Sequence, residues 1–318
     1  MPATRHLLHW VFPALVAASA AAGDFAFVTN QNSDDLSILN IATGAEERRV
    51  SVPGKPAGVA VHAGSGKFFT VSPDSKTVRR YALKTGDMEH ALALDGGPIG
   101  IAVEPSGKRL FVSDWYNARI WVIDSATMAL IGTLESGSAP AGIAISSDGQ
   151  TLASADRDAD QVSIFDLDSL QLRRRIGVGV RPFGLSFSSD GRLFVGNVGS
   201  DDVTVVSPET GAVLATIPVG ARPYGIAFAM DRGFVTNQYA DTVSVFDAKT
   251  LKVISSVDVG EYPEGIDATT DGAFVVVANW FSNSVSVIDA QTLEVVGEIE
   301  TGDGPRAFGK FITAERSD

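Results

Sequence analysis

The chain contains no cysteine and only four histidines among its 318 residues. Disulfides, thiolate metal ligands and a lipid-modified N-terminal cysteine are therefore excluded. Only His62 and His90 lie beyond residue 22, and they are isolated from each other. The sequence thus lacks a three-histidine metal site, a His-Glu-x-x-His motif and the Gly-x-Ser-x-Gly elbow of a serine hydrolase. Haem ligation is equally unsupported.

Positive charge is also scarce. Lys and Arg together number 25 against 38 Asp and Glu, which gives a formal net charge of -13. Cationic side chains supply most of the attraction to nucleic acid and to anionic lipid, so neither is an expected partner. A phosphate-binding Gly-x-x-x-x-Gly-Lys-Ser/Thr loop is missing as well.

Residues 1–22 have the features of a secretory signal peptide. Arg5 precedes an apolar run over residues 7–18, and small residues follow, with cleavage expected after Ala20 or Ala22. An uncleaved anchor is the alternative, but Pro13 interrupts the run, which is shorter than the roughly 20 residues that span a bilayer. We expect a periplasmic or secreted protein whose mature chain, residues 23–318, is one domain without membrane insertion.

A motif of proline, one variable residue and glycine recurs through the whole mature chain. Its prolines are separated by 42, 42, 42, 41, 40 and 42 residues, which indicates a repeat architecture. The seven copies are Pro56-Ala57-Gly58, Pro98-Ile99-Gly100, Pro140-Ala141-Gly142, Pro182-Phe183-Gly184, Pro223-Tyr224-Gly225, Pro263-Glu264-Gly265 and, with the glycine replaced, Pro305-Arg306-Ala307.

Each repeat predicts four short strands. In residues 222–260, apolar or alternating segments are separated by turn residues such as Asp231-Arg232-Gly233, and β-branched residues argue against a helical repeat. Seven such antiparallel sheets predict an all-β, seven-bladed β-propeller. The N-terminus supplies three strands of one blade, and we expect residues 305–312 to supply its fourth and close the ring.

The repeats resemble the YVTN β-propeller family. Phe27-Val28-Thr29-Asn30 and Phe234-Val235-Thr236-Asn237 each differ by one residue from the Tyr-Val-Thr-Asn signature, and the likeness covers residues 24–312. Blade two departs most, with Arg79-Arg80-Tyr81 where Val-Ile-Asp is usual. The resemblance implies an exported propeller, in some cases an accessory to a periplasmic quinoprotein or transport system.

Most repeated residues have structural explanations. We expect the repeat glycines to lie where inner strands crowd the axis, and Asp124, Asp166, Asp247 and Asp289 to cap turns.

Residues that differ between blades at one end of the channel are candidates for binding. The loop before the inner strand and the loop between strands two and three emerge at this end. Together they present four cations, Lys55, Arg181, Arg222 and Arg306, and five aromatic residues, Trp115, Tyr116, Tyr239, Trp280 and Phe281. Arginines pair well with carboxylates and phosphates, and exposed loop aromatics are typical of contact surfaces. Alternatively, the arginines pair with rim aspartates such as Asp201, Asp241 or Asp303, and the aromatics fold back over the blades.

We therefore expect a non-enzymatic, monomeric binding protein without a cofactor, which captures a partner protein or a small anionic ligand at the channel mouth. A lactonase- or lyase-type enzyme is the first alternative. It would use a divalent metal, for which Asp74, Asp114 and Asp156 are the channel carboxylates available. A cell-surface structural repeat is the second alternative. The tryptophans expected to dock a quinone are missing.

Overall fold

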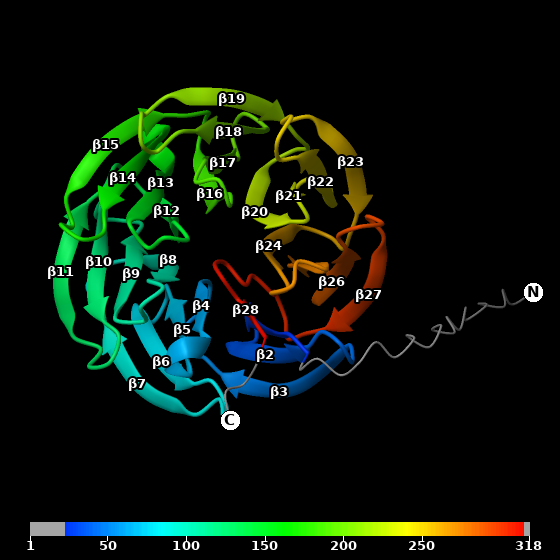
Figure 1. Cartoon of the computed structure of the whole chain (residues 1–318). Helices are drawn as coiled ribbons and strands as arrows, with labels where there is room; N and C mark the ends of the chain where they lie inside the picture. Colours follow the sequence, from blue (N-terminus) through cyan, green and yellow to red (C-terminus); the bar gives the residue numbers. More distant parts are fainter. Residues whose placement is uncertain (1–22, 315–318) are drawn as a thin grey trace, which may run out of the picture.

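The computed structural model describes residues 23–314 and contains seven four-stranded antiparallel sheets arranged around a central axis (Figure 1). The predicted fold is confirmed. Blade 1 contains β28 (Ile312–Thr313), β1 (Phe25–Asn30), β2 (Asp35–Asn40) and β3 (Ala45–Ser51). Blade 2 contains β4 (Val59–His62), β5 (Lys67–Ser72), β6 (Thr77–Ala82) and β7 (Met88–Ala93). Blade 3 contains β8 (Pro98–Val103), β9 (Arg109–Asp114), β10 (Arg119–Asp124) and β11 (Leu130–Glu135).

The remaining blades follow the same order from the axis outward. Blade 4 contains β12 (Pro140–Ile145), β13 (Thr151–Asp156), β14 (Gln161–Asp166) and β15 (Leu172–Gly177). Blade 5 contains β16 (Pro182–Phe187), β17 (Leu193–Asn197), β18 (Asp202–Val206) and β19 (Val213–Pro218). Blade 6 contains β20 (Pro223–Ala229), β21 (Arg232–Asn237), β22 (Thr242–Asp247) and β23 (Val253–Asp258). Blade 7 contains β24 (Pro263–Ala268), β25 (Phe274–Asn279), β26 (Ser284–Asp289) and β27 (Val295–Glu300).

Helix is limited to two short 3₁₀ turns in residues 23–314, η1 (Ala63–Ser65) and η2 (Arg157–Ala159). None of the helices in this part of the chain is long and apolar enough to cross a membrane. The proposed signal peptide lies outside the described residues.

Burial follows position within the blade. The second strands are buried on both faces between neighbouring blades, as in β21, whereas the outermost strands are mostly exposed and bury at most one residue, such as Val257 of β23. The hydrophobic core is therefore a series of clusters between adjacent blades rather than one central mass.

The repeat glycines are where adjacent blades approach most closely. A Cβ on Gly184 would lie 2.0 Å from the carbonyl oxygen of Tyr224, the variable residue of the next repeat. The same contact recurs around the ring, between Gly58 and Ile99, Gly100 and Ala141, Gly142 and Phe183, Gly225 and Glu264, and Gly265 and Arg306, at 2.2–2.7 Å. This confirms that packing at the axis requires glycine.

We predict that Gly184→Ala lowers the free energy of unfolding by about 3 kcal/mol, because the added methyl group would overlap a backbone oxygen. Gly177→Ala is the matched control, since a Cβ there meets nothing within 4 Å and should change stability by less than about 0.5 kcal/mol. Urea unfolding would measure both. Equal stability of the two variants would contradict the packing role.

The ring closes as expected, with β28 pairing with β1 through Phe25 with Thr313 and Ala26 with Ile312. The expected fourth strand over residues 305–312 is wrong in extent, however. Ala307 has a φ of 46° and Gly309 a φ of 135°, so this segment cannot remain extended. The segment keeps two backbone hydrogen bonds to β1, from the Arg306 N–H to the Thr29 carbonyl at 2.8 Å and from the Phe27 N–H to the Phe311 carbonyl at 2.9 Å. Between them, the carbonyls of Phe308 and Lys310 accept hydrogen bonds from blade 2, from the N–H groups of Val59 and Val61 at 3.1 and 3.0 Å.

The last residue of each second strand carries a buried polar side chain. Asn237 is typical: its amide donates to Thr242 and Ser244 at 3.0 and 2.9 Å, within its own blade. Asp156 and Asp114 occupy the same register in blades 4 and 3, ending β13 and β9. Burial raises the pKa of Asp156, whose bonded neighbours Ser163, Gln161 and Ser154 carry no charge.

Asp114 has the opposite balance. Burial favours the neutral acid, but hydrogen bonds from the Gly97 N–H, Asn117 and the Arg119 guanidinium outweigh it and lower the pKa. These contacts give both aspartates a structural role.

We predict that Asp156→Asn raises the free energy of unfolding at pH 7 by about 1 kcal/mol, because it removes a charge whose burial is unfavourable. A raised pKa in the folded state means that the wild type loses stability as pH rises above the ordinary aspartate value. The gain should therefore vanish below about pH 4. Asp114→Asn should instead destabilise at pH 7, and a stabilising effect there would contradict this explanation. Denaturant unfolding at several pH values measures both.

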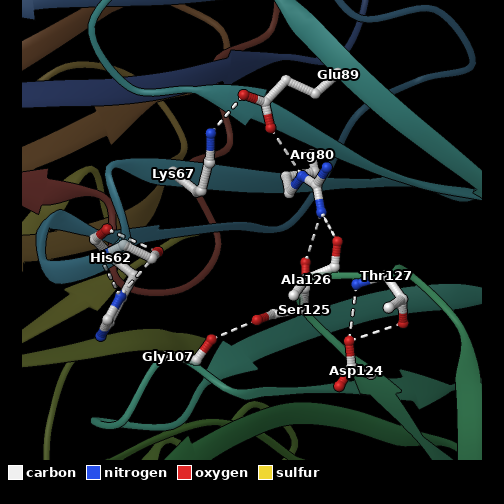
Figure 2. A network of polar contacts seen from close by, with 10 residues as sticks. His62, Lys67, Arg80, Glu89, Gly107, Asp124, Ser125, Ala126 and Thr127 are labelled. Carbon is white, nitrogen blue, oxygen red and sulfur yellow. Dashed lines mark hydrogen bonds and ion pairs between the residues drawn. The ribbon is translucent and has the colours of Figure 1, made fainter.

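Arginine side chains also join neighbouring blades at the end of the ring away from the repeat prolines. Figure 2 shows Arg80, on the unusual third strand of blade 2, donating to the carbonyls of Ser125 and Ala126 in blade 3. Arg192 and Arg232 reach the corresponding turns of blades 6 and 7. In the same turn Asp124 accepts from the Thr127 N–H and hydroxyl, each at 2.7 Å, which confirms its predicted capping role (Figure 2).

Candidate functional site

The two loop sets do emerge at the same end of the ring, here called the proline face. It comprises the loops that lead into the inner strands and those between the second and third strands. The Trp115 N–H donates to the Gly97 carbonyl at 2.9 Å, and the Gln238 N–H to the Arg222 carbonyl at 3.0 Å. Each of these hydrogen bonds joins a loop that leads into an inner strand to a loop between a second and a third strand.

Arg306 lies at the axis of this face, in an ion pair with a carboxylate. Its Nε is 2.7 Å from Oε2 of Glu264, and its Nη1 is 3.3 Å from Oε1 of Gln31. Its Nη2 donates to the Tyr224 hydroxyl. Glu264 also accepts from Nε2 of Gln238 at 2.6 Å. The guanidinium is therefore compensated from within the protein.

The ionisation of this pair follows from its burial. Glu264 is 3% exposed, and burial raises its pKa although Arg306 opposes the shift. Burial would lower the pKa of Arg306, but the charge of Glu264 and the hydrogen bonds raise it above its ordinary value. Arg306 therefore remains charged. Its side chain is only 17% exposed and is already paired with Glu264, so its charge serves the structure more than the binding of an external anion.

Aromatic rings fill the axis beneath this pair. Phe183 lies 4.2 Å from Tyr224 and 5.1 Å from Phe308, measured between ring centroids, and Trp115 packs on Phe183 at 6.1 Å. Burial raises the pKa of Tyr224. These rings join with Ala141 and Val198 in one buried cluster, so the channel mouth is filled rather than open.

We predict that Arg306→Gln lowers the free energy of unfolding by about 3 kcal/mol, because it leaves the buried Glu264 carboxylate without its ion-paired guanidinium. The double variant Glu264→Gln/Arg306→Gln should recover most of that loss, since neither charge remains. Urea unfolding of both single variants and the double variant gives the coupling energy. Additive effects would show that the pair is not coupled.

A second group of aromatic residues lies toward the outside of the proline face, over blades 6 and 7. Tyr262 is the hub, with ring centroids 5.6 Å from Tyr239, 5.7 Å from Trp280 and 4.8 Å from Phe281. Tyr239 and Phe281 are 60% and 58% exposed. The Arg222 guanidinium lies 4.7 Å from the Tyr239 ring centroid and donates to its hydroxyl at 3.1 Å. We call these five residues the aromatic rim.

The remaining predicted site residues lie apart from the aromatic rim. Trp115 packs on the axial ring of Phe183, and the Arg157 guanidinium lies 5.3 Å from the centroid of the Trp115 ring. Tyr116 is 76% exposed on blade 3, and Arg181 is exposed on the loop before β16. The Lys55 ammonium donates to the Asn32 carbonyl at 3.3 Å. The nine predicted residues thus form an axial group, a rim group and isolated positions.

The rim aspartates act mainly through backbone contacts. Six of the seven residues before the repeat prolines have left-handed backbones, Gly97 being the exception, and Arg181 and Arg222 have φ of 54° and 58°. Their N–H groups donate to Asp160 and Asp201, each at 2.7 Å. The pairing of arginine side chains with Asp201, Asp241 or Asp303, the alternative to ligand binding, is not found in residues 23–314. Hydrogen bonds to aspartate side chains therefore stabilise the left-handed backbone of Arg181 and Arg222.

Sequence reasoning grouped Arg306 with Lys55, Arg181 and Arg222 in the loops that lead into the inner strands, but those three directly precede a repeat proline, and the equivalent residue in the seventh copy is Gly304. Arg306 is the variable residue of its Pro-x-Gly copy, and so are Phe183, Tyr224 and Glu264. Sequence reasoning did not identify Phe183, Tyr224 and Glu264 as axial residues. It also missed Gln31 and Gln238, which directly follow the buried asparagines that end β1 and β21. A comparison across the repeats of the variable Pro-x-Gly residue, and of the residue that follows each second strand, would have identified these five axial residues.

Within residues 23–314, no group of three or more His, Asp or Glu side chains is arranged to hold a metal ion. Asp114 and Asp156 bond to groups within their own blades, as described above.

A family model described as YNCE-like beta-propeller matches residues 5–316. The chain belongs to this family. Among solved structures, Kuenenia stuttgartiensis hydrazine synthase is 18% identical, with a TM-score of 0.77 over 88% of this chain and 99% of that one. A functionally unknown protein from Desulfotomaculum acetoxidans DSM 771 is 16% identical, with a TM-score of 0.77 over 88% and 98%. At these identities the likeness concerns the fold alone. No curated protein matches.

Proposed function

We propose that this YNCE-like propeller is an exported, non-enzymatic binding protein that captures a partner protein through the aromatic rim of its proline face. The observation that carries the proposal is the exposure of Tyr239 and Phe281 beside the Arg222 guanidinium. Aromatic and arginine side chains dominate the energy of protein interfaces.

The contacts of the rim favour a partner segment that combines an apolar or aromatic side chain with a carboxylate. The rings of Tyr239, Tyr262 and Phe281 form a contiguous aromatic cluster, and Trp280 packs on Tyr262 and Phe281. Arg222 has no carboxylate partner in the described part of the chain, although its charge lies on the ring of Tyr239. A guanidinium held on an aromatic face can still pair with a carboxylate from outside.

A small anionic ligand is the narrower form of the same proposal, and Arg222 would be its counter-ion. Arg306 is less suited to this role because Glu264 already neutralises it. Export depends on the signal peptide proposed for residues 1–22. The YVTN resemblance and an accessory role beside a periplasmic quinoprotein or transport system also belong to this proposal.

The test is affinity capture from periplasmic or culture extract with the mature protein as bait. We predict that Arg222→Ala/Phe281→Ala reduces recovery of the specific partner at least tenfold, since each hot-spot side chain contributes about 2 kcal/mol or more. Leu130→Ala is the matched control, because Leu130 is 50% exposed on the outermost strand of blade 3. Circular dichroism should show both variants folded.

Recovery that is unchanged in the rim variant would place the binding surface elsewhere. Metal analysis of the purified mature protein separates the enzyme alternative, since a stoichiometric Ca²⁺, Mg²⁺ or Zn²⁺ would contradict the proposal made here.

A further inference from the structure

A cavity of about 420 Å³ occupies the channel on the side away from the proline face. It extends from the level of the repeat glycines to the turns between the first and second strands, where Ser146, Ser147, Ser188 and Ser189 line it. The volume lies within the range of small-molecule sites. None of the residues proposed to capture a partner lines it.

The wall of the cavity is mainly aliphatic. The inner strands of blades 3 to 7 each contribute one branched side chain directly after the repeat glycine, namely Ile101, Ile143, Leu185, Ile226 and Ile266. Phe308 lines the inner end and contacts Phe183 and Tyr224, whose rings fill the axis beyond it. The cavity is therefore closed toward the proline face, and a ligand must enter from the opposite end.

One cation lies in this wall. Lys310 and His62 are the only ionisable residues among those lining the cavity. The two ring nitrogens of His62 are occupied, with Nδ1 accepting from the Ser65 N–H at 3.0 Å and Nε2 lying 3.1 Å from the Pro105 carbonyl oxygen. The Lys310 side chain is 71% exposed and lines the cavity, so a ligand that enters the cavity can reach it.

The carboxylate beside Lys310 is saturated by other donors. Asp267 is almost fully buried and accepts from the N–H groups of Ala268, Phe311 and Ile312 at 2.9–3.1 Å, in addition to Lys310 Nζ at 2.8 Å. An ammonium has three donors, and Lys310 uses one of them here. Two N–H groups remain for an anion in the cavity.

We propose that this cavity binds an amphipathic monocarboxylate, with its aliphatic chain between the inner strands and its carboxylate on Lys310. A blind apolar cavity with one cation near an open end fits a single-headed ligand. A single ammonium that already contacts Asp267 suits one negative charge better than a dianion.

Isothermal titration calorimetry with octanoate tests the proposal. The wild type should bind one octanoate per chain. Leu185→Trp should weaken binding at least tenfold by filling the cavity, and Leu185→Phe serves if the larger substitution prevents folding. Lys310→Gln should weaken octanoate binding about tenfold while leaving 1-octanol nearly unchanged, because only the charged hydrogen bond is lost.

Failure of the wild type to bind octanoate would overturn the proposal. So would undiminished octanoate binding by a folded Leu185 variant, or equal loss of octanoate and 1-octanol in Lys310→Gln. Phe281→Ala is the control on the proline face and should bind octanoate like the wild type. Its result also separates this cavity from the aromatic rim, since either site can fail without the other.

Discussion

The contact between a repeat glycine and the backbone of the next blade is the constraint on which the structure depends. Each such glycine faces the carbonyl of the variable residue in the following Pro-x-Gly copy, too closely for a side chain. In three blades a hydroxyl strengthens the junction, as when Thr236 accepts from the Gly225 N–H and donates to the Glu264 carbonyl, both at 2.8 Å. The backbone of six of the seven variable residues, all but Ala57, is fixed by this contact, and their side chains determine what occupies the axis.

The chain end uses the same position differently. Figure 1 shows the segment that precedes β28 entering the centre of the ring. Left-handed geometry at Ala307 and the φ of 135° at Gly309 break its strand. Alternate residues then line the channel at successive depths: Arg306 beside Glu264, Phe308 among the axial rings, and Lys310 in the wall of the cavity. One segment thus closes the ring and also supplies three of the side chains that line the channel.

The period and the alternation of the sequence predicted the blades, their number and the closure, because backbone pairing and glycine packing repeat in every unit. They could not predict the axial ion pair. Glu264 and Arg306 are 42 residues apart in sequence and meet only because the ring brings blade 7 beside the chain end. Tyr239, Trp280 and Phe281 were identified from their loops, but their common contact, Tyr262, depends on side-chain directions that periodicity does not encode.

The two ends of the channel therefore differ in physical character. On the proline face, Glu264 neutralises Arg306 at the axis. At the rim, the Arg222 guanidinium lies over the ring of Tyr239. Attraction for an acidic partner is thus displaced from the axis to an exposed aromatic surface, which suits a macromolecule more than a small ion. At the other end, Lys310 lines a mainly aliphatic cavity that opens away from the proline face, and the spacing of the inner strands limits the ligand to what fits between them.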